Sequence, residues 1–571
     1  MLKPTLNKDF YGRLGTYIFI GSLIFYFLLK LPFNLSVLCS STNEGFYFIF
    51  GQHFLNGMQF NPPERPCLTL FVLIYALILK IFGFGSWSII AVHFIQTILV
   101  VLIGILMFLI MDKLLDHRLY AGLTVLFWIL LQLTPIGLWG YKLELDAIFA
   151  LEAEYFILLF SFLSFYILVK SCKSEHWSVY FISGLIASMP IMFKASGGVF
   201  IIAIFCWFLY MAILGRDLFF YTRSKFIFLF AGIILGLLLF NIFILSQNIS
   251  ILKYWKHLFS VGMYSNDYTR SFKLLLHNVF NFMTRYVPST SNFILFFFST
   301  VGAIWIILRR HFIVDILKMS TPLILLAIWG IGNMFSVIAP GGYGAYYYIL
   351  VWPFVAIFTI LLIKDFFNKS PFLRRGFVRA FAGLLIFIFV ALRIYNCFPP
   401  FLSIVYEQNN LSLFNQPESF QENVQAGTSI NSKRVNLLKA TDILNNFLPD
   451  KNDTIYILNS LQGKLNYFPI TGYIYIKRMP PTTAVSDYLF YKMYIDNAIK
   501  TLINDLIKAP PKIIVFPQNI VSEEWNLEKL SVLIKWLDGF LIKNYHFKSG
   551  IRYFDDKKTL NVIYNVYERN W

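Results

Sequence analysis

The sequence is poor in cysteine, in acidic residues and in charge of any kind. Its 571 residues include five cysteines, and no CxxC or Cys/His spacing connects them, so no structural zinc site is expected. Lys and Arg number 48 against 30 Asp and Glu, and the charged share is only 14%. The basic excess forms no stripe with interleaved aromatic residues, which argues against nucleic-acid binding. Internal repeats, which many transporters have, are also missing.

Apolar residues, by contrast, are abundant. They make up 58% of the chain, and the mean hydropathy is +0.65. A soluble domain cannot cover so much apolar surface. Runs of roughly 20 apolar residues recur, each long enough to cross a hydrocarbon core of about 30 Å. We therefore expect a polytopic α-helical membrane protein with about eleven transmembrane helices. The predicted spans cover 15–37, 86–111, 119–139, 147–169, 178–193, 197–214, 226–246, 291–308, 319–339, 346–363 and 379–397.

The distribution of Lys and Arg predicts the orientation of these spans. With eleven spans, the N-terminus and all the basic loops fall on one side, which is then cytoplasmic. The outer loop 38–85 contains a short apolar piece, 68–83, after a Pro-rich turn, and this piece is predicted to be an interfacial helix. If 68–83 crossed the membrane, the basic loops would alternate sides. These loops contain Lys113 and Arg118, Lys170 and Lys173, Arg216, Arg223 and Lys225, Arg309, Arg310 and Lys318, and Lys364 to Arg379.

The composition changes near residue 400, where the long apolar runs stop. Segments 454–458 and 512–516 are short, β-branched and aromatic, which predicts strands, and 485–508 has helical spacing. We expect a transmembrane domain over 1–399 and a soluble α/β domain over 400–571 on the outer face.

Four polar features fall at the outer ends of the predicted spans. Ionisable groups at membrane depth are costly, so they usually line a water-filled cavity or have partners. Ordinary alternatives stay open: Glu44 as a solvated loop acid, Lys194 snorkelling to the interface, Arg65 in a structural ion pair, and the tyrosines as an interfacial belt. The four features are the loop with Asn43, Glu44, Tyr47, His53, Glu64 and Arg65, the acids Glu144, Asp146, Glu152 and Glu154, the single Lys194, and the turn with Tyr346, Tyr347 and Tyr348.

The four acids at the start of the fourth span divide by helical geometry. If 144–154 is one helix, Asp146 stacks with Glu154, and Glu144 stacks with Glu152, because residues four apart share a face. Only one pair can then face a single cleft, and the spacing does not select between them.

These residue types suit sugar transfer from a lipid phosphate. A carboxylate can activate an acceptor hydroxyl, directly or through a metal ion. Arg and Lys can stabilise the leaving phosphate by charge-assisted hydrogen bonds. The same inventory would serve a proton-coupled transporter, so a flippase of a lipid-linked glycan is the alternative.

The order of these motifs resembles a known group, the GT-C glycosyltransferases of the protein O-mannosyltransferase and lipid A aminoarabinose transferase type, which are family 39-like. The resemblance covers roughly residues 10–400. One departure is Asn43, which stands where the family has Asp. The matching residues are Asn43 to Tyr47, Gly57, Pro62 to Pro66, Phe82-Gly83, Leu151 to Phe156, Gly184-Leu185, Phe193-Lys194 and Trp352 to Phe354.

The resemblance implies a role for each candidate residue. Glu44 would be the catalytic carboxylate or the ligand of a divalent metal such as Mg or Mn, and Glu154 or Glu152 would assist it. The implied substrate-binding residues are Arg65, Glu64, Lys194, Tyr47, Asn43 and Tyr347. The donor would be a polyprenyl-phosphate sugar, and the acceptor a lipid-linked glycan, a wall polymer or a protein. The implied location is the bacterial inner membrane, with the C-terminal domain in the periplasm.

Overall fold

The computed structural model describes about three fifths of the chain and divides it into two units. The first unit contains Met1–Asn34, His93–Ser246 and Leu258–Val405, and the second contains Leu35–Val92, Gln247–His257 and Tyr406–Trp571. The expected boundary near residue 400 lies outside the described residues. These are 4–35, 42–58, 60, 69–133, 151–171, 176–214, 216–261, 277, 280, 299–304, 320–338, 345–369, 391, 444–448, 450, 453–457, 480, 495–517, 527–554 and 560–570.

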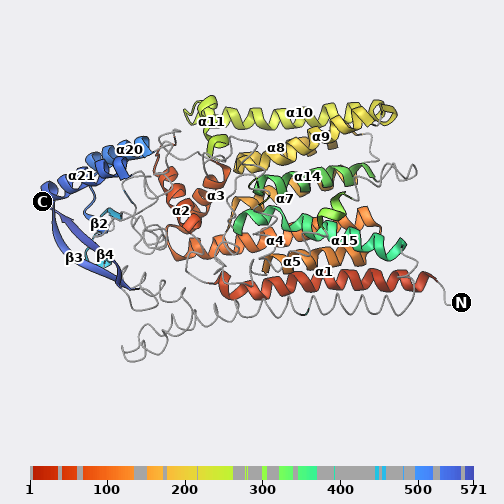
Figure 1. The fold of residues 1–571 in the computed structure, drawn as a ribbon, viewed down its shortest axis with the longest axis horizontal. Helices are drawn as coiled ribbons and strands as arrows, with labels where there is room; N and C mark the ends of the chain where they lie inside the picture. The colour runs from red at the N-terminus through yellow and green to blue at the C-terminus, as the bar shows by residue number, and fades with distance from the viewer. Residues whose placement is uncertain are drawn as a thin grey trace. The chain divides into compact units, whose positions relative to one another are not determined.

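Long apolar helices build the first unit, and several of them lie side by side in Figure 1. Among the described residues, six helical segments are long and apolar enough to cross a membrane, and four more apolar helices are shorter. The chain is thus a multi-pass membrane protein. Most of the predicted spans 291–308 and 379–397 lie outside the described residues. The helices are α1 (Pro4–Asn34), α4 (Ser86–Leu115), α5 (Arg118–Leu133), α7 (Ala153–Lys170), α8 (Trp177–Phe193), α9 (Gly198–Leu214), α10 (Arg216–Ser246), α14 (Ser320–Ile338) and α15 (Trp352–Lys369), with the 3-10 turns η1 (Ala195–Gly197) and η6 (Ala345–Leu350).

Small residues set how closely these helices approach. A Cβ added to Gly184 in α8 would collide with the carbonyl of Leu229 in α10, so the two backbones are in contact there. Between α7 and α8, the hydroxyl of Ser164 donates to the carbonyl of Ser183 at 2.9 Å, and the Ser183 hydroxyl donates back at 3.0 Å. Such contacts between small and polar residues stabilise helix association in a bilayer, where burial of apolar side chains gives no net driving force for association.

Basic residues gather at one end of the first unit. Lys364 Nζ in α15 donates to the carbonyl of Leu115 at the end of α4, at 2.7 Å. The Lys225 ammonium lies 5.3 Å from the ring centroid of Tyr180, at the start of α8. These contacts bring together loops that the sequence placed on one side. That this side is cytoplasmic stays a prediction.

In two predicted spans the regular α-helix begins a few residues later than expected. The fourth span was expected to begin at 147, but Glu152 is extended, with φ −114° and ψ 152°, and α7 begins at Ala153. The tenth was expected to begin at 346, but 345–350 form the 3-10 turn η6 and α15 begins at Trp352. Pro353 favours this start, because proline fits the first turn of a helix, where no amide hydrogen bond is lost.

In the second unit, α2 (Thr42–Leu55) packs against α3 (Leu70–Phe82). A Cβ on Gly51 would lie 2.8 Å from the backbone nitrogen of Ala76, so only glycine allows this approach. Thr69 caps α3 at its start, and Gly83, at φ 76°, ends it. The predicted helix over 68–83 is confirmed. At 1.5 Å per residue its 13 residues reach only about 20 Å, which is too short to span a bilayer. Its interfacial position stays a prediction.

Near the C-terminus, a four-stranded sheet carries two helices. The strand order is β1-β2-β4-β3, with β1 and β2 parallel and the other pairs antiparallel. The strands predicted at 454–458 and 512–516 are confirmed, and 485–508 is helical from Ile495 onward. The elements are β1 (Ile455–Ile457), α20 (Ile495–Lys508), β2 (Ile513–Pro517), α21 (Leu527–Asn544), β3 (Tyr545–Phe554) and β4 (Leu560–Arg569). The remaining helix, α11 (Ile251–Val261), follows α10.

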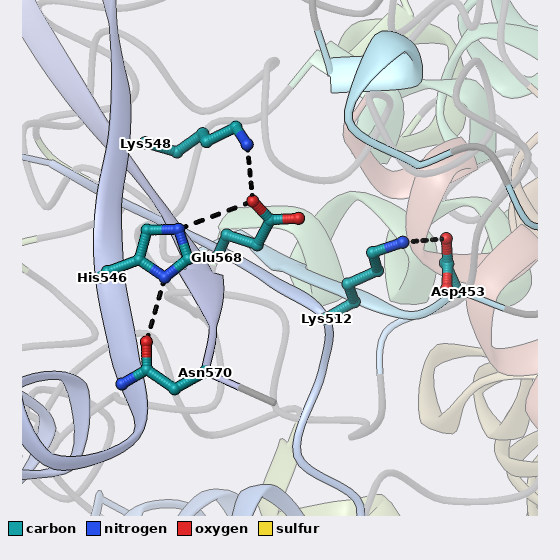
Figure 2. Close-up of polar contacts among 6 residues, drawn as sticks. All are labelled: Asp453, Lys512, His546, Lys548, Glu568 and Asn570. Carbon is teal, nitrogen blue, oxygen red and sulfur yellow. Dashed lines mark hydrogen bonds and ion pairs between the residues drawn. The ribbon is translucent and has the colours of Figure 1, made fainter.

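Apolar and polar contacts both stabilise this sheet. Tyr456, Leu502 and Leu537 belong to a buried core between the sheet and the two helices. Figure 2 shows the polar contacts around the strands. Lys512 Nζ pairs with Asp453 at 2.9 Å and Lys548 Nζ with Glu568 at 2.8 Å, while His546 Nδ1 lies 3.0 Å from the Asn570 side-chain oxygen. The α/β architecture is observed. Its place on the outer face stays a prediction.

Candidate functional site

An ion pair joins the start of α7 to the break after α8. Lys194 Nζ lies 2.5 Å from Glu154 Oε1. The Glu154 side chain is fully buried, whereas that of Lys194 is 32% exposed. Both residues were candidates from the sequence, and the structure brings them together across 40 positions of chain. The interpretation of Lys194 as a merely snorkelling residue does not fit this contact.

Local sequence explains why the lysine stands at this position. Helix α8 contains Pro190 and ends at Phe193, and Lys194 is extended before the turn η1. The amide of Gly197 donates to the Lys194 carbonyl at 2.9 Å. A Cβ on Gly197 would collide with the carbonyl of Pro190, so this tight break requires glycine. The break leaves the Lys194 side chain outside the helical register and directs it to α7.

Glu154 is fully buried, and aromatic rings pack nearby along α7. Phe193 stacks on Phe156 with 5.0 Å between ring centroids and on Phe160 with 5.7 Å. Glu154 is in the first turn of α7, where the helix dipole favours a carboxylate. Its second oxygen, Oε2, is buried and makes no hydrogen bond within the described part of the chain. This oxygen is therefore an acceptor whose hydrogen-bonding capacity is unused by the described residues.

Glu152 has a different setting from Glu154. It precedes α7 as the N-cap residue, is nearly buried, and its carbonyl accepts the Tyr155 amide at 3.2 Å. Because Glu152 is not helical, the stacking expected for one helix over 144–154 does not hold. Glu144 and Asp146 lie outside the described residues. The acid that pairs with Lys194 is Glu154.

A buried polar network beside this pair was missed by the sequence reasoning. Gln96 Nε2 in α4 donates to the Tyr26 hydroxyl of α1 at 3.0 Å, and Gln96 also shares a hydrogen bond with Tyr155 of α7. A signal exists in the first span, where Tyr26, Lys30 and Asn34 recur every four residues and are all buried. This spacing marks a polar face on an otherwise apolar helix.

In the second unit, Glu44 is fully buried in the first turn of α2. The alternative of a solvated loop acid is therefore wrong. Tyr47 packs its ring against Phe71 at 4.4 Å and Tyr75 at 5.5 Å between centroids. His53 at the end of α2 is buried as well. The convergence of Glu44 with the pair in the first unit stays a prediction.

The remaining candidates are only partly placed. Asn43 lies in the first turn of α2 and Tyr347 in η6, and their side chains are not described. Glu64 and Arg65 lie outside the described residues. Beside Tyr347, the ring of Tyr348 is buried and stacks on Trp352 at 5.5 Å. At least this tyrosine packs inside the protein and does not form a belt at the interface.

A metal site is not assembled by the described residues. Within those ranges, no three side chains of His, Cys, Asp or Glu gather closely enough to hold a metal ion. Glu44 as the ligand of a divalent metal therefore stays a prediction.

Comparison with known proteins gives matches only at the level of structure. No protein-family model and no curated protein sequence matches the chain. An oligosaccharyltransferase from Archaeoglobus fulgidus, solved with zinc and sulfate, is 14% identical, with a TM-score of 0.47 over 95% of this chain and 72% of its own. A second structure of that protein, tethered to an acceptor peptide, is 14% identical, with a TM-score of 0.45 over 96% and 74%.

A third solved structure matches over nearly the whole length of both chains. It is ArnT from Cupriavidus metallidurans bound to undecaprenyl phosphate, 11% identical, with a TM-score of 0.51 over 96% of this chain and 97% of its own. At such low identity the likeness concerns the fold alone. ArnT is a GT-C glycosyltransferase, and the chain has the same fold.

Proposed function

We propose that the protein is a glycosyltransferase that takes a sugar from a polyprenyl-phosphate donor and transfers it to an acceptor hydroxyl. The observation that carries this proposal is the ion pair between the buried Glu154 and the partly exposed Lys194 at the start of α7, in a chain with the GT-C fold. The ArnT structure holds undecaprenyl phosphate, which supports a lipid-phosphate donor. The acceptor would be a lipid-linked glycan, a wall polymer or a protein at the outer face of a bacterial inner membrane.

The proposed reaction is a displacement at the anomeric carbon. The acceptor oxygen forms a bond to that carbon, the bond to the donor phosphate oxygen breaks, and polyprenyl phosphate leaves with the bonding electrons. A carboxylate takes the proton of the acceptor hydroxyl, and Glu44 is the proposed base. Glu154 is proposed to assist, since its Oε2 makes no hydrogen bond to the described residues.

Lys194 is proposed to stabilise the phosphate as negative charge develops on it. A third of its side chain is exposed, whereas its carboxylate partner is buried. An anionic ligand can therefore approach the ammonium without displacing Glu154. Charge-assisted hydrogen bonds in a site with little water are among the strongest that proteins make. The resemblance alone supports the remaining roles. We propose that Arg65 and Glu64 bind the donor and that Tyr47, Asn43 and Tyr347 surround the sugar.

The decisive experiment measures transfer of labelled sugar by the purified protein from a panel of polyprenyl-phosphate sugars. Glu44→Gln is expected to lower turnover at least about a hundredfold, the usual effect of losing a general base, with donor binding retained. Glu568→Gln is the matched control, because it makes the same chemical change in the C-terminal sheet.

Each other outcome has its own meaning. Loss of turnover on chelation, restored by Mg or Mn, would make Glu44 a metal ligand. No turnover with any donor, together with movement of a lipid-linked glycan across proteoliposomes, would replace the transferase with a flippase.

A further inference from the structure

We propose that Gln96 and Tyr155 are positioning residues, which hold the first turn of α7 so that Glu154 meets Lys194. The inference rests on the proposed function only for its effect on turnover, since the network itself is a structural feature. Neither residue was a candidate from the sequence.

The network connects three helices through one amide side chain. The Tyr26 hydroxyl donates to Gln96 Oε1 at 3.3 Å, and Gln96 Nε2 donates to the Tyr26 oxygen at 3.0 Å. Tyr155 shares a further hydrogen bond with Gln96. All three side chains are fully buried. Hydrogen bonds in such a low-dielectric place are stronger than in water, and removing one member leaves the others unsatisfied.

Tyr155 is the neighbour of Glu154, and this makes the network relevant to the ion pair. Successive residues of a helix point about 100° apart, so fixing the direction of one fixes the direction of the next. The first turn of α7 needs such help, because the amides at a helix start lack intrahelical partners and Glu152 gives no side-chain cap. The carboxylates of Glu152 and Glu154 also lie within electrostatic range of the Tyr155 hydroxyl.

A neighbouring contact supplies a control. Asn34 Nδ2 of α1 donates to the Thr97 hydroxyl of α4 at 2.9 Å. This contact joins the same two helices as the pair of Tyr26 and Gln96, one residue further along α4. In the described structure it includes no residue of α7. Thr97→Val therefore perturbs the packing of α1 against α4 without touching Tyr155.

The first test follows Lys194 directly and needs no activity. Full-length protein in detergent is treated with an amine-reactive reagent, and mass spectrometry gives the labelling rate at Lys194. Only the neutral amine reacts, so an ammonium held by Glu154 reacts slowly. Tyr155→Phe and Gln96→Leu should each raise the rate by about two- to tenfold, which corresponds to losing one ordinary hydrogen bond. Thr97→Val should leave it unchanged.

The second test uses turnover. Tyr155→Phe should lower kcat and leave the KM for the donor unchanged, because the lysine is still present but misdirected. Combined with Glu154→Gln, it should cause no further loss, since no carboxylate remains to be positioned. Thr97→Val combined with Glu154→Gln should show only the sum of its separate effects.

The two tests separate the possible failures. Wild-type reactivity of Lys194 in both Tyr155→Phe and Gln96→Leu would overturn the inference, whatever happens to turnover. An equal rise in Thr97→Val would also overturn it, because the effect would then be general helix packing. If the two variants raise the labelling of Lys194 but the wild-type protein has no transferase activity, the proposed function is refuted and the positioning role of Gln96 and Tyr155 is supported.

Discussion

Replacement of Lys194 by Met should destabilise the protein far more than replacement of Glu154 by Gln. Lys194→Met keeps the length of the side chain and removes its charge. The fully buried Glu154 carboxylate then loses its cation. Breaking a buried pair in this way typically costs about 3–5 kcal/mol, because one charge is left uncompensated in a medium of low polarity.

The opposite substitution has a smaller cost for a structural reason. After Glu154→Gln, the lysine is still 32% exposed and can turn toward water. We expect a loss of about 1–2 kcal/mol, in the range of a hydrogen bond to a charged group. The double substitution removes both charges, so it should be less destabilised than Lys194→Met alone.

The assay is unfolding by titration with a denaturing detergent, followed by circular dichroism, which gives a free energy for each variant. Lys170→Met is the matched control, since that lysine ends α7 on an exposed surface and should lose less than about 1 kcal/mol. A Lys194→Met variant no less stable than Glu154→Gln, or a double variant whose loss equals the sum of the two, would refute the reasoning.

Three further predictions concern the second unit and the close helix contacts. Gly51→Ala should cost about 1–3 kcal/mol by overpacking, because its Cβ would lie 2.8 Å from the Ala76 nitrogen. Gly21→Ala is the control, since a Cβ there would meet no atom within 4 Å, and it should be neutral or stabilising. The same detergent titration measures the unfolding free energy of both variants. Burial raises the pKa of Tyr545, so the stability it contributes is present below the unfolded value of about 10 and is lost as the pH rises further. Tyr545→Phe should therefore cost about 1 kcal/mol at pH 7 through its lost hydrogen bond. The variant should also lose less stability than the wild type when the pH rises above 10. Unfolding free energies of both proteins at pH 7 and above pH 10 would show this. Glu568→Gln should change stability by less than about 1 kcal/mol, because its partners Lys548 and His546 are 41% and 52% exposed; a larger loss in the titration would contradict this.

Local signals in the sequence predicted the elements whose ends depend on local chemistry. Helix α3 was predicted because a short apolar run follows a Pro-rich turn, and the structure ends it at Gly83, which takes a positive φ. The strands β1 and β2 were predicted because a short β-branched run is typical of a buried strand. Lys194 and Glu154 were identified because ionisable residues stand out in apolar surroundings.

The parts that the sequence could not show depend on distant contacts. Gln96 meets Tyr26 across 70 positions, and no local spacing predicts which faces of α1 and α4 meet. The choice between Glu152 and Glu154 depended on where α7 begins, and a helix start cannot be read to within one residue from an acidic, apolar stretch. In the structure, Glu152 is the extended residue before α7, and Glu154 lies in its first turn.

The unequal burial of the ion pair says more about function than its existence does. A buried pair is weak evidence for stability, because desolvation offsets much of the attraction. Had the pair served only to join α7 to α8, apolar contacts such as the stack of Phe156 on Phe193 would do so without that cost. Instead the carboxylate is fully enclosed and the ammonium is partly open. This arrangement keeps a cation at a fixed place with part of its side chain accessible, as recognition of an anion requires.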